Sequence, residues 1–76
     1  MPKFKLLDVR PIIARGHDPF SRIRASLAVL KPGDGLSITA PFLPSPLIEL
    51  LRAEGFQSRV ERQPGRGWIT HFWRDD

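Results

Sequence analysis

The sequence predicts a small α/β protein, a two-layer sandwich in which two helices cover one face of a four-stranded mixed sheet. Three observations lead to this fold class. Apolar residues alternate with polar ones in some segments, recur at spacings of three and four in others, and proline or glycine separates these segments. The chain has 76 residues. That length suits one thin core, so we expect residues 1–76 to form a single domain.

The first strand and helix follow from the residues at their ends. Residues 4–9 mix aliphatic and charged side chains and are predicted to form a strand. Residues 10–17 are predicted to form a loop, because Pro11 disfavours helical backbone just before it. Asp18 and Pro19 then indicate a helix start, since aspartate caps a free N–H group and proline gives up only an unpaired donor. One apolar stripe follows along this helix: Phe20, Ile23, Leu27 and Leu30.

The middle of the chain repeats the strand–helix unit. Residues 31–33 (Lys-Pro-Gly) are predicted to end the first helix. Residues 36–40 alternate strictly, which predicts a strand with its apolar side chains facing the core. Ser45 and Pro46 indicate the start of a second helix, with Ser45 as its cap, and Gly55 is a left-handed stop. The residues expected to line this helix are Leu47, Leu50 and Leu51.

The C-terminal part is predicted to be a β-hairpin. The period returns to two from Phe56, residues 64–67 (Pro-Gly-Arg-Gly) form a turn, and residues 68–73 form the returning strand. Strands joined by a helix are expected to run parallel with a right-handed crossover, whereas the last two pair antiparallel. The predicted order is therefore β-α-β-α-β-β, with both helices on one face of the sheet.

Composition excludes several classes of function. The chain has no cysteine, which excludes disulfides, thiolate-bound zinc, iron–sulfur clusters and a thiol nucleophile. Its net charge is +4, and nine of its twelve basic residues are arginine. A mildly basic surface and an acidic partner both explain this balance. We expect a cytoplasmic protein that is not associated with a membrane, because no apolar run approaches about 18 residues.

Short segments carry a resemblance to known families. Residues 7–10 (Leu-Asp-Val-Arg) before a proline that opens a helix resemble the TusA/SirA-like sulfur carriers. Residues 30–34 (Leu-Lys-Pro-Gly-Asp) and 40–42 (Ala-Pro-Phe) fit a cysteine-less sister group better, the bacterial family known as domain of unknown function 2249. The chain is identified as a member of that group. The resemblance spans nearly the whole chain and implies a TusA-like fold.

The resemblance also bears on activity. The sulfur carriers hold a persulfide on the cysteine of a Cys-Pro-x-Pro motif, and the corresponding residues here are Asp18, Pro19, Phe20 and Ser21. A carboxylate at Asp18 cannot carry a sulfane sulfur, so the carrier activity does not transfer. The resemblance implies a non-enzymatic accessory or binding module in bacterial sulfur or redox metabolism. We predict no catalytic residue and no cofactor.

The carboxyl ends of the two parallel strands form the first candidate site. Loops 10–18 and 41–45 are expected to border one crevice, with both helix N-termini beside it. Helix N-termini attract anions, although Pro19 and Pro46 each remove a donor there. The residues expected to bind a ligand or partner are Arg10, Arg15, His17, Asp18, Phe20 and Phe42. Within this set we interpret Asp18 as a helix cap.

The two histidines are candidates for a metal site, but their spacing does not support one. His17 adjoins Asp18 near the first helix, whereas His71 lies in the last strand. A facial triad would require the fold to bring the two rings together. We therefore predict no metal, and we interpret His17 as a solvated loop residue. The sequence also lacks a Gly-x-Ser-x-Gly elbow and a phosphate-binding glycine loop.

The last strand suggests a second candidate surface. If Trp68, Thr70 and Phe72 face the helices, the alternate residues lie on a sheet face that is open to water. That face then carries an apolar patch made of Phe4, Leu6, Ile69, His71 and Trp73. Such a patch predicts a protein partner or a homodimer. Two alternatives stay open: reversed parity, or cover of the patch by the stems of Lys5 and Arg59.

Nucleic-acid binding is the alternative function. Arginines together with Trp68, Phe72 and Trp73 on a sheet can stack on the bases of single-stranded RNA. The aromatic motif of RNA-binding sheets is absent from the sequence, and the basic residues form no visible stripe. A third hypothesis is a metal- or anion-binding role, or an enzyme, built on His17 and Asp18.

Overall fold

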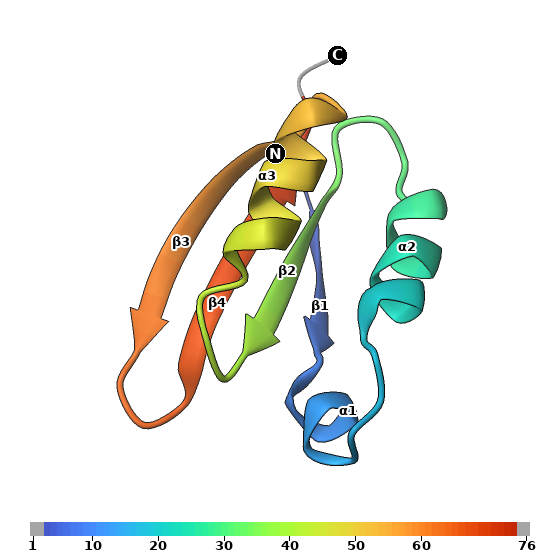
Figure 1. Cartoon of the computed structure of the whole chain (residues 1–76). Coiled ribbons are helices and arrows are strands. Elements are labelled where there is room, and N and C mark those ends of the chain that lie inside the picture. The colour runs from blue at the N-terminus through green and yellow to red at the C-terminus, as the bar shows by residue number, and fades with distance from the viewer. Residues whose placement is uncertain (1–2, 75–76) are drawn as a thin grey trace.

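The computed structural model describes residues 3–74, and over these residues a four-stranded sheet carries three helices (Figure 1). The elements are β1 (Phe4–Asp8), α1 (Arg10–Ala14), α2 (Phe20–Ala28), β2 (Gly35–Ala40), α3 (Ser45–Ala53), β3 (Gln57–Gln63) and β4 (Gly67–Trp73). The strand order is β1-β2-β4-β3, with β1 and β2 parallel and the other neighbours antiparallel. The predicted fold class, a two-layer α/β sandwich on a mixed sheet, is confirmed.

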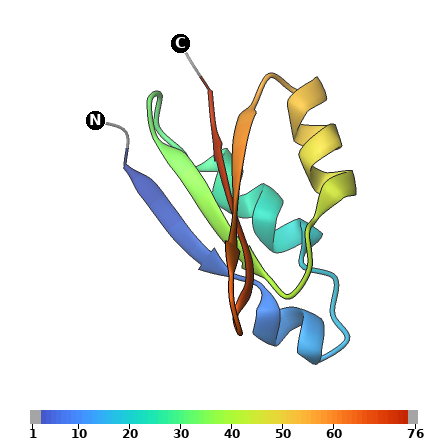
Figure 2. The same cartoon turned by 90° about the vertical axis from the view of Figure 1, so that its left-hand side faces the viewer.

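Helices α2 and α3 form the second layer and pack on the same face of the sheet (Figures 1 and 2). The core lies between them and the strands, and its fully buried side chains include Leu36, Ile38, Leu51 and Phe72. Within residues 3–74 the other face of the sheet carries no helix (Figure 2). One side of this sheet is therefore packed against helices and the other is not.

The predicted loop at residues 10–17 is wrong over its first half, because Arg10–Ala14 form helix α1. Pro11 lies in the first turn of this helix, where its missing N–H group has no helical partner to lose. The Asp8 carboxylate accepts a hydrogen bond from the Arg10 N–H at 3.0 Å and so stabilises this end. Gly16 then ends α1 with a φ of 77°, and the N–H of His17 bonds the Ile12 carbonyl.

Helix α2 begins one residue later than predicted, at Phe20, and ends earlier than predicted. The N-cap position is Pro19 rather than the predicted Asp18, but the Asp18 carboxylate accepts the Phe20 N–H at 2.9 Å and so satisfies a free donor at the helix start. The helix stops at Ala28, so the predicted extent to residue 31 is wrong. Leu30 packs against the core from outside the helix, and its N–H bonds the carbonyl of Leu27. The chain therefore keeps the apolar contact of Leu30 while leaving the helix.

Helix α3 differs from prediction at both its cap and its buried face. Ser45 makes no side-chain capping bond; instead the Pro44 carbonyl accepts the N–H of Ile48. The residues of α3 that pack most deeply on the sheet are Ile48 and Leu51, whereas Leu50 is 39% exposed. The expected position of Leu50 in the core is thus wrong. Helix α3 is rotated about its axis so that Leu50 points toward α2 rather than toward the sheet.

The end of α3 and the hairpin follow their local signals. Gly55 has a φ of 94°, and the Phe56 N–H bonds the Leu51 carbonyl at 2.9 Å, as in a Schellman motif. The hairpin turn places Gly67 at a φ of 98°. A Cβ atom at Gly67 would lie 2.9 Å from the Cα of Pro41, so the backbone of the hairpin approaches the end of β2 closely.

The structure decides the side-chain parity of the last strand, which the sequence left open, and excludes the reversed parity. Thr70 and Phe72 are fully buried beneath the helices. On the opposite face, strand pairing aligns Leu6, Ser37, His71 and Arg59 in one row across all four strands. None of the helices in the described part of the chain is long and apolar enough to span a membrane.

Candidate functional site

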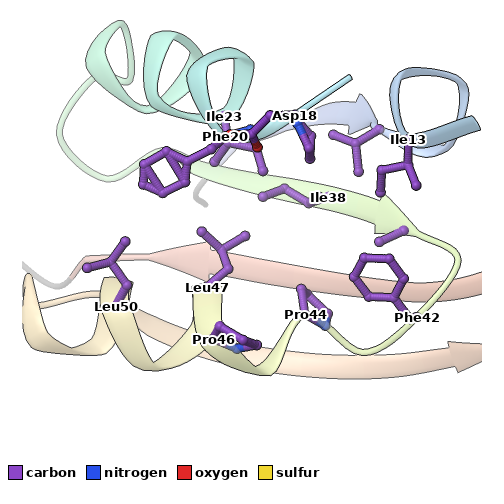
Figure 3. A pocket seen from close by; sticks show the side chains of 13 residues that line it. Ile13, Asp18, Phe20, Ile23, Ile38, Phe42, Pro44, Pro46, Leu47 and Leu50 are labelled. Carbon is purple, nitrogen blue, oxygen red and sulfur yellow. The ribbon is translucent and has the colours of Figure 1, made fainter. Parts of the chain in front are cut away.

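An apolar cleft of about 280 Å³ lies between α2 and α3 (Figure 3). Its floor is the end of β2, its walls are the two helices, and its mouth lies at the segment after β2. The residues lining it are Val9, Ile13, Asp18, Pro19, Phe20, Ile23, Ile38, Ala40, Phe42, Pro44, Pro46, Leu47 and Leu50. Asp18 is the one charged residue among these described lining residues. The cleft is thus suited to an apolar group rather than to an anion.

The rotation of α3 positions one wall of this cleft. Because Ile48 and Leu51 pack on the sheet, Leu47 and Leu50 lie a quarter-turn away and face α2 (Figure 3). Phe20 occupies the facing wall at the start of α2. Phe42 stands at the mouth and is 51% exposed. The cleft therefore exposes large apolar side chains at its rim.

Asp18 lies at the rim of the cleft, where α2 begins (Figure 3). One of its carboxylate oxygens accepts the Phe20 N–H, and the residue is exposed to solvent. This carboxylate satisfies a free donor at the helix start and also gives the rim a negative charge. A basic group beside an apolar one would complement that arrangement.

The structure directs Arg10 away from the cleft, which contradicts the expected crevice. Its guanidinium binds the carboxylate of Asp8 through two hydrogen bonds, of 2.9 and 2.7 Å. A third bond, of 3.2 Å, reaches the carbonyl of Arg66 in the hairpin turn. The hydrogen bond from Arg10 lowers the pKa of Asp8 below its ordinary value of 3.8. Arg10 therefore joins the end of β1 to the hairpin.

Arg15 and His17 also lie outside the cleft, because helix α1 carries them to the other side of the start of α2. They border a shallow, open depression together with Ile12, Ser21 and Arg22. Asp18 lines both this depression and the cleft. Of the six residues predicted for one crevice, the cleft thus contains Asp18, Phe20 and Phe42 and lacks the three basic ones.

An ion pair ties the two helices that flank the cleft. Arg24 of α2 donates to both carboxylate oxygens of Glu54, which caps the end of α3, and one of these bonds measures 2.6 Å. The Arg24 guanidinium also lies 5.3 Å from the centre of the Phe20 ring. The hydrogen bond from Arg24 lowers the pKa of Glu54. This contact joins the two helices that form the cleft walls.

The second candidate surface lies on the opposite side of the sheet. We call it the open face and define it by the residues that line its groove: Phe4, Leu6, Ser37, Arg59, Glu61, His71 and Trp73. Four of the five predicted patch residues belong to it. Ile69 does not line the groove, although its register between Thr39 and Glu61 places it on the same face. Leu6 is 85% exposed, so side-chain stems do not cover this residue.

The polar centre of the open face was missed by sequence reasoning. The Ser37 hydroxyl lies 2.6 Å from Nδ1 of His71, and Nε2 of His71 lies 3.6 Å from Oε1 of Glu61. The three residues come from three different strands, so only their register brings them together. Ser37 is 2% exposed, and β2 is paired on both sides. This arrangement offers neither an accessible nucleophile nor free N–H groups for an oxyanion.

The two histidines do not share a site. His71 belongs to the open face, whereas His17 borders the depression beside α2. The possibility that the fold unites them in a metal site is therefore wrong. Across residues 3–74, no group of three or more His, Asp or Glu side chains is placed to hold a metal ion.

The fold and the cleft define the class of protein: a small two-layer α/β domain whose helix layer carries an apolar groove. The chain belongs to the family described as "Uncharacterized conserved protein (DUF2249)", whose model matches residues 6–74. This confirms the family expected from the sequence. Comparison with curated proteins gave no match, and comparison with solved structures gave none.

Proposed function

We propose that this protein is a binding module that holds an apolar side chain of a partner protein in the cleft between α2 and α3. The observation that carries the proposal is the lining of the cleft, which is apolar except for Asp18 at its rim. Protein interfaces place their binding energy in a few apolar anchors that fill such pockets. Exposed Phe42 and Leu50 at the rim extend the apolar surface beyond the cleft.

The size of the cleft supports a side chain as its occupant. Its volume of about 280 Å³ falls just below the roughly 300–1,000 Å³ of typical small-molecule and cofactor sites. Its lining provides one carboxylate and no cluster of polar groups to orient a cofactor. The carboxylate of Asp18 favours a partner with a basic residue next to its apolar anchor.

Selection of peptides tests this function. Random peptides displayed on phage are selected on the immobilised full chain, and the enriched peptides are synthesised for titration calorimetry. We expect them to share an aromatic or aliphatic anchor and to bind the Leu50→Glu variant at least about tenfold more weakly. Val29→Glu is the matched control, because Val29 is 62% exposed at the far end of α2. Absence of enrichment, or equal binding to Leu50→Glu, contradicts the proposal.

We further propose that the partner belongs to bacterial sulfur or redox metabolism in the cytoplasm. Support for this setting comes from the resemblance of residues 7–10 and Pro19 to the TusA-like carriers, although Asp18 stands in place of the persulfide cysteine. A chain without cysteine would contribute to sulfur transfer by docking a protein that carries one. Titration against a purified TusA-like carrier in its persulfide form tests the setting. Binding that is lost in Leu50→Glu supports it, and absence of binding removes the sulfur link.

A further inference from the structure

We propose that the open face is the interface of a homodimer, in which it packs against the same face of a second copy of this chain. The first support is its apolar content. Leu6 is 85% exposed and Phe4 is 37% exposed at the strand edge. The centre of the Phe4 ring lies 5.6 Å from the centre of the His71 ring and 6.2 Å from that of Trp73, both in edge-on geometry. These three rings therefore form one cluster. Contiguous apolar surface of this kind indicates an interaction site.

The charges of the open face identify a second copy as its occupant. Arg59 and Glu61 lie two residues apart on β3 and therefore point to the same face. They carry opposite charges, and Arg59 forms no ion pair within residues 3–74. In a two-fold interface, residue i meets residue j and residue j meets residue i. Arg59 of each copy then faces Glu61 of the other, which makes the surface complementary to itself.

The net charge of the groove argues against a nucleic-acid partner at this surface. The sequence has twelve basic and eight acidic residues, and the groove holds one of each. The formal charge of the groove is therefore balanced, and the excess of basic residues in the chain does not belong to it. An anionic strand would meet Glu61 as well as Arg59 there. A surface with balanced charges fits a copy of itself better than a uniformly charged polymer.

The size of the face predicts a weak dimer. Strands spaced about 4.8 Å apart and rising about 3.3 Å per residue give the four strands, of five, six, seven and seven residues, a face of roughly 400 Å². Two copies would bury roughly 800 Å² in total, below the roughly 1,200–2,000 Å² of stable standard interfaces. We therefore expect dissociation in the micromolar range, with the two sheets packed about 10 Å apart.

A charge swap tests the dimer. Sedimentation equilibrium is measured on the full chain and on Arg59→Glu, Glu61→Arg and the double variant. Each single change places like charges across the interface and should weaken association at least about tenfold, whereas the double variant restores the attraction. An equimolar mixture of the two single variants should form a heterodimer, because both cross-pairs are then attractive. Circular dichroism checks that each variant is folded.

The control variant is Arg62→Glu, which makes the same charge change on the other face of β3, where the register pairs Arg62 with Trp68. We expect its association to match that of the unchanged chain. A chain that stays monomeric at about 1 mM overturns the proposal. So does a double variant or a mixture that fails to associate. Binding of a uridine oligonucleotide by the monomer, lost in Trp73→Ala, would assign the face to RNA instead.

Discussion

The helix-covered face and the open face of this sheet bury their central residues by different means. On the first, α2 and α3 exclude water from Leu36 and Ile38. On the second, Gly35 and Ser37 are equally buried although no described helix lies over them. There the Phe4 ring occupies the space beside Gly35, where a Cβ atom would lie 2.6 Å from Cδ2 of Phe4. A central strand with small residues thus lets neighbouring side chains close a face without a second layer.

This difference has a functional consequence. The helix layer leaves an apolar cleft where its two helices diverge, so the proposed partner site on that side is concave. The open face is covered only by its own side chains, and it presents charges and rings on a shallow groove of a sheet. The first geometry favours a single inserted side chain, whereas the second favours another extended surface.

The largest expected effect is the difference in the free energy of unfolding between removing a buried ring and removing an exposed aliphatic side chain. Phe72 is fully buried beneath the helices and Leu6 is 85% exposed on the open face. Phe72→Ala should lower the free energy of unfolding by about 3–5 kcal/mol, since it leaves a cavity in the core. Leu6→Ala should change it by less than about 0.5 kcal/mol in the monomer. Urea denaturation at low protein concentration measures both. Equal losses would show that the open face is packed like the core.

A smaller effect on the free energy of unfolding is expected from removing either of two buried hydroxyl groups, one on each face. Thr70 Oγ1 lies beneath the helices and has no hydrogen-bond partner among the described residues. Ser37 on the open face has His71 as its partner. Thr70→Val should raise the free energy of unfolding by about 1 kcal/mol, because it removes an unpaired polar group. Ser37→Ala should lower it by about 1 kcal/mol, because His71 loses a bond. Urea denaturation should therefore show changes of opposite sign in the free energy of unfolding of the two variants. A decrease in both variants would contradict the conclusion that the Thr70 hydroxyl is unpaired.

The smallest expected effect concerns the ion pairs at the two sides of the sheet. Arginine neighbours lower the pKa values of Asp8 and Glu54 below their ordinary values of 3.8 and 4.5. The stability that these carboxylates contribute is therefore fully present above the ordinary values and is lost as the pH falls through the lowered ones. Both pairs are exposed, so the effect is small. Thermal midpoints measured between neutral and acidic pH should fall less in Asp8→Asn and in Glu54→Gln than in the unchanged chain. Parallel curves for all three proteins would refute a role for these pairs.

Some features of the fold could be predicted because they depend on neighbours in the sequence. Asp18 satisfies a free donor of α2 two positions away, and Gly55 ends α3 in the left-handed conformation that lacks a steric penalty for glycine. The alternation around Thr70 and Phe72 predicted that these residues share one face of β4, although only the structure decided that this face lies beneath the helices. These signals are local, so the sequence alone reveals them.

Other features depend on how distant elements pack. Pro11 signals a break in the chain, but its position in a first turn makes a helix compatible with it. Ile48 and Leu50 are both aliphatic but point to different sides of the helix, and the rotation of α3 against the sheet decided which of them was buried. The loop that carries Arg15 was expected at the crevice, and α1 turned it to the far side of α2.

The sequence by itself determined the order of the four strands and of the helices α2 and α3, the family and the absence of thiol chemistry, but it did not reveal helix α1. Only the tertiary structure decided that the cleft is apolar and that Ser37, His71 and Glu61 meet on the open face. The physical reason is the range of the interactions. Caps, turns and alternation act within a few residues, whereas a site is formed by side chains that meet only after helix rotation and strand register are set by packing the core.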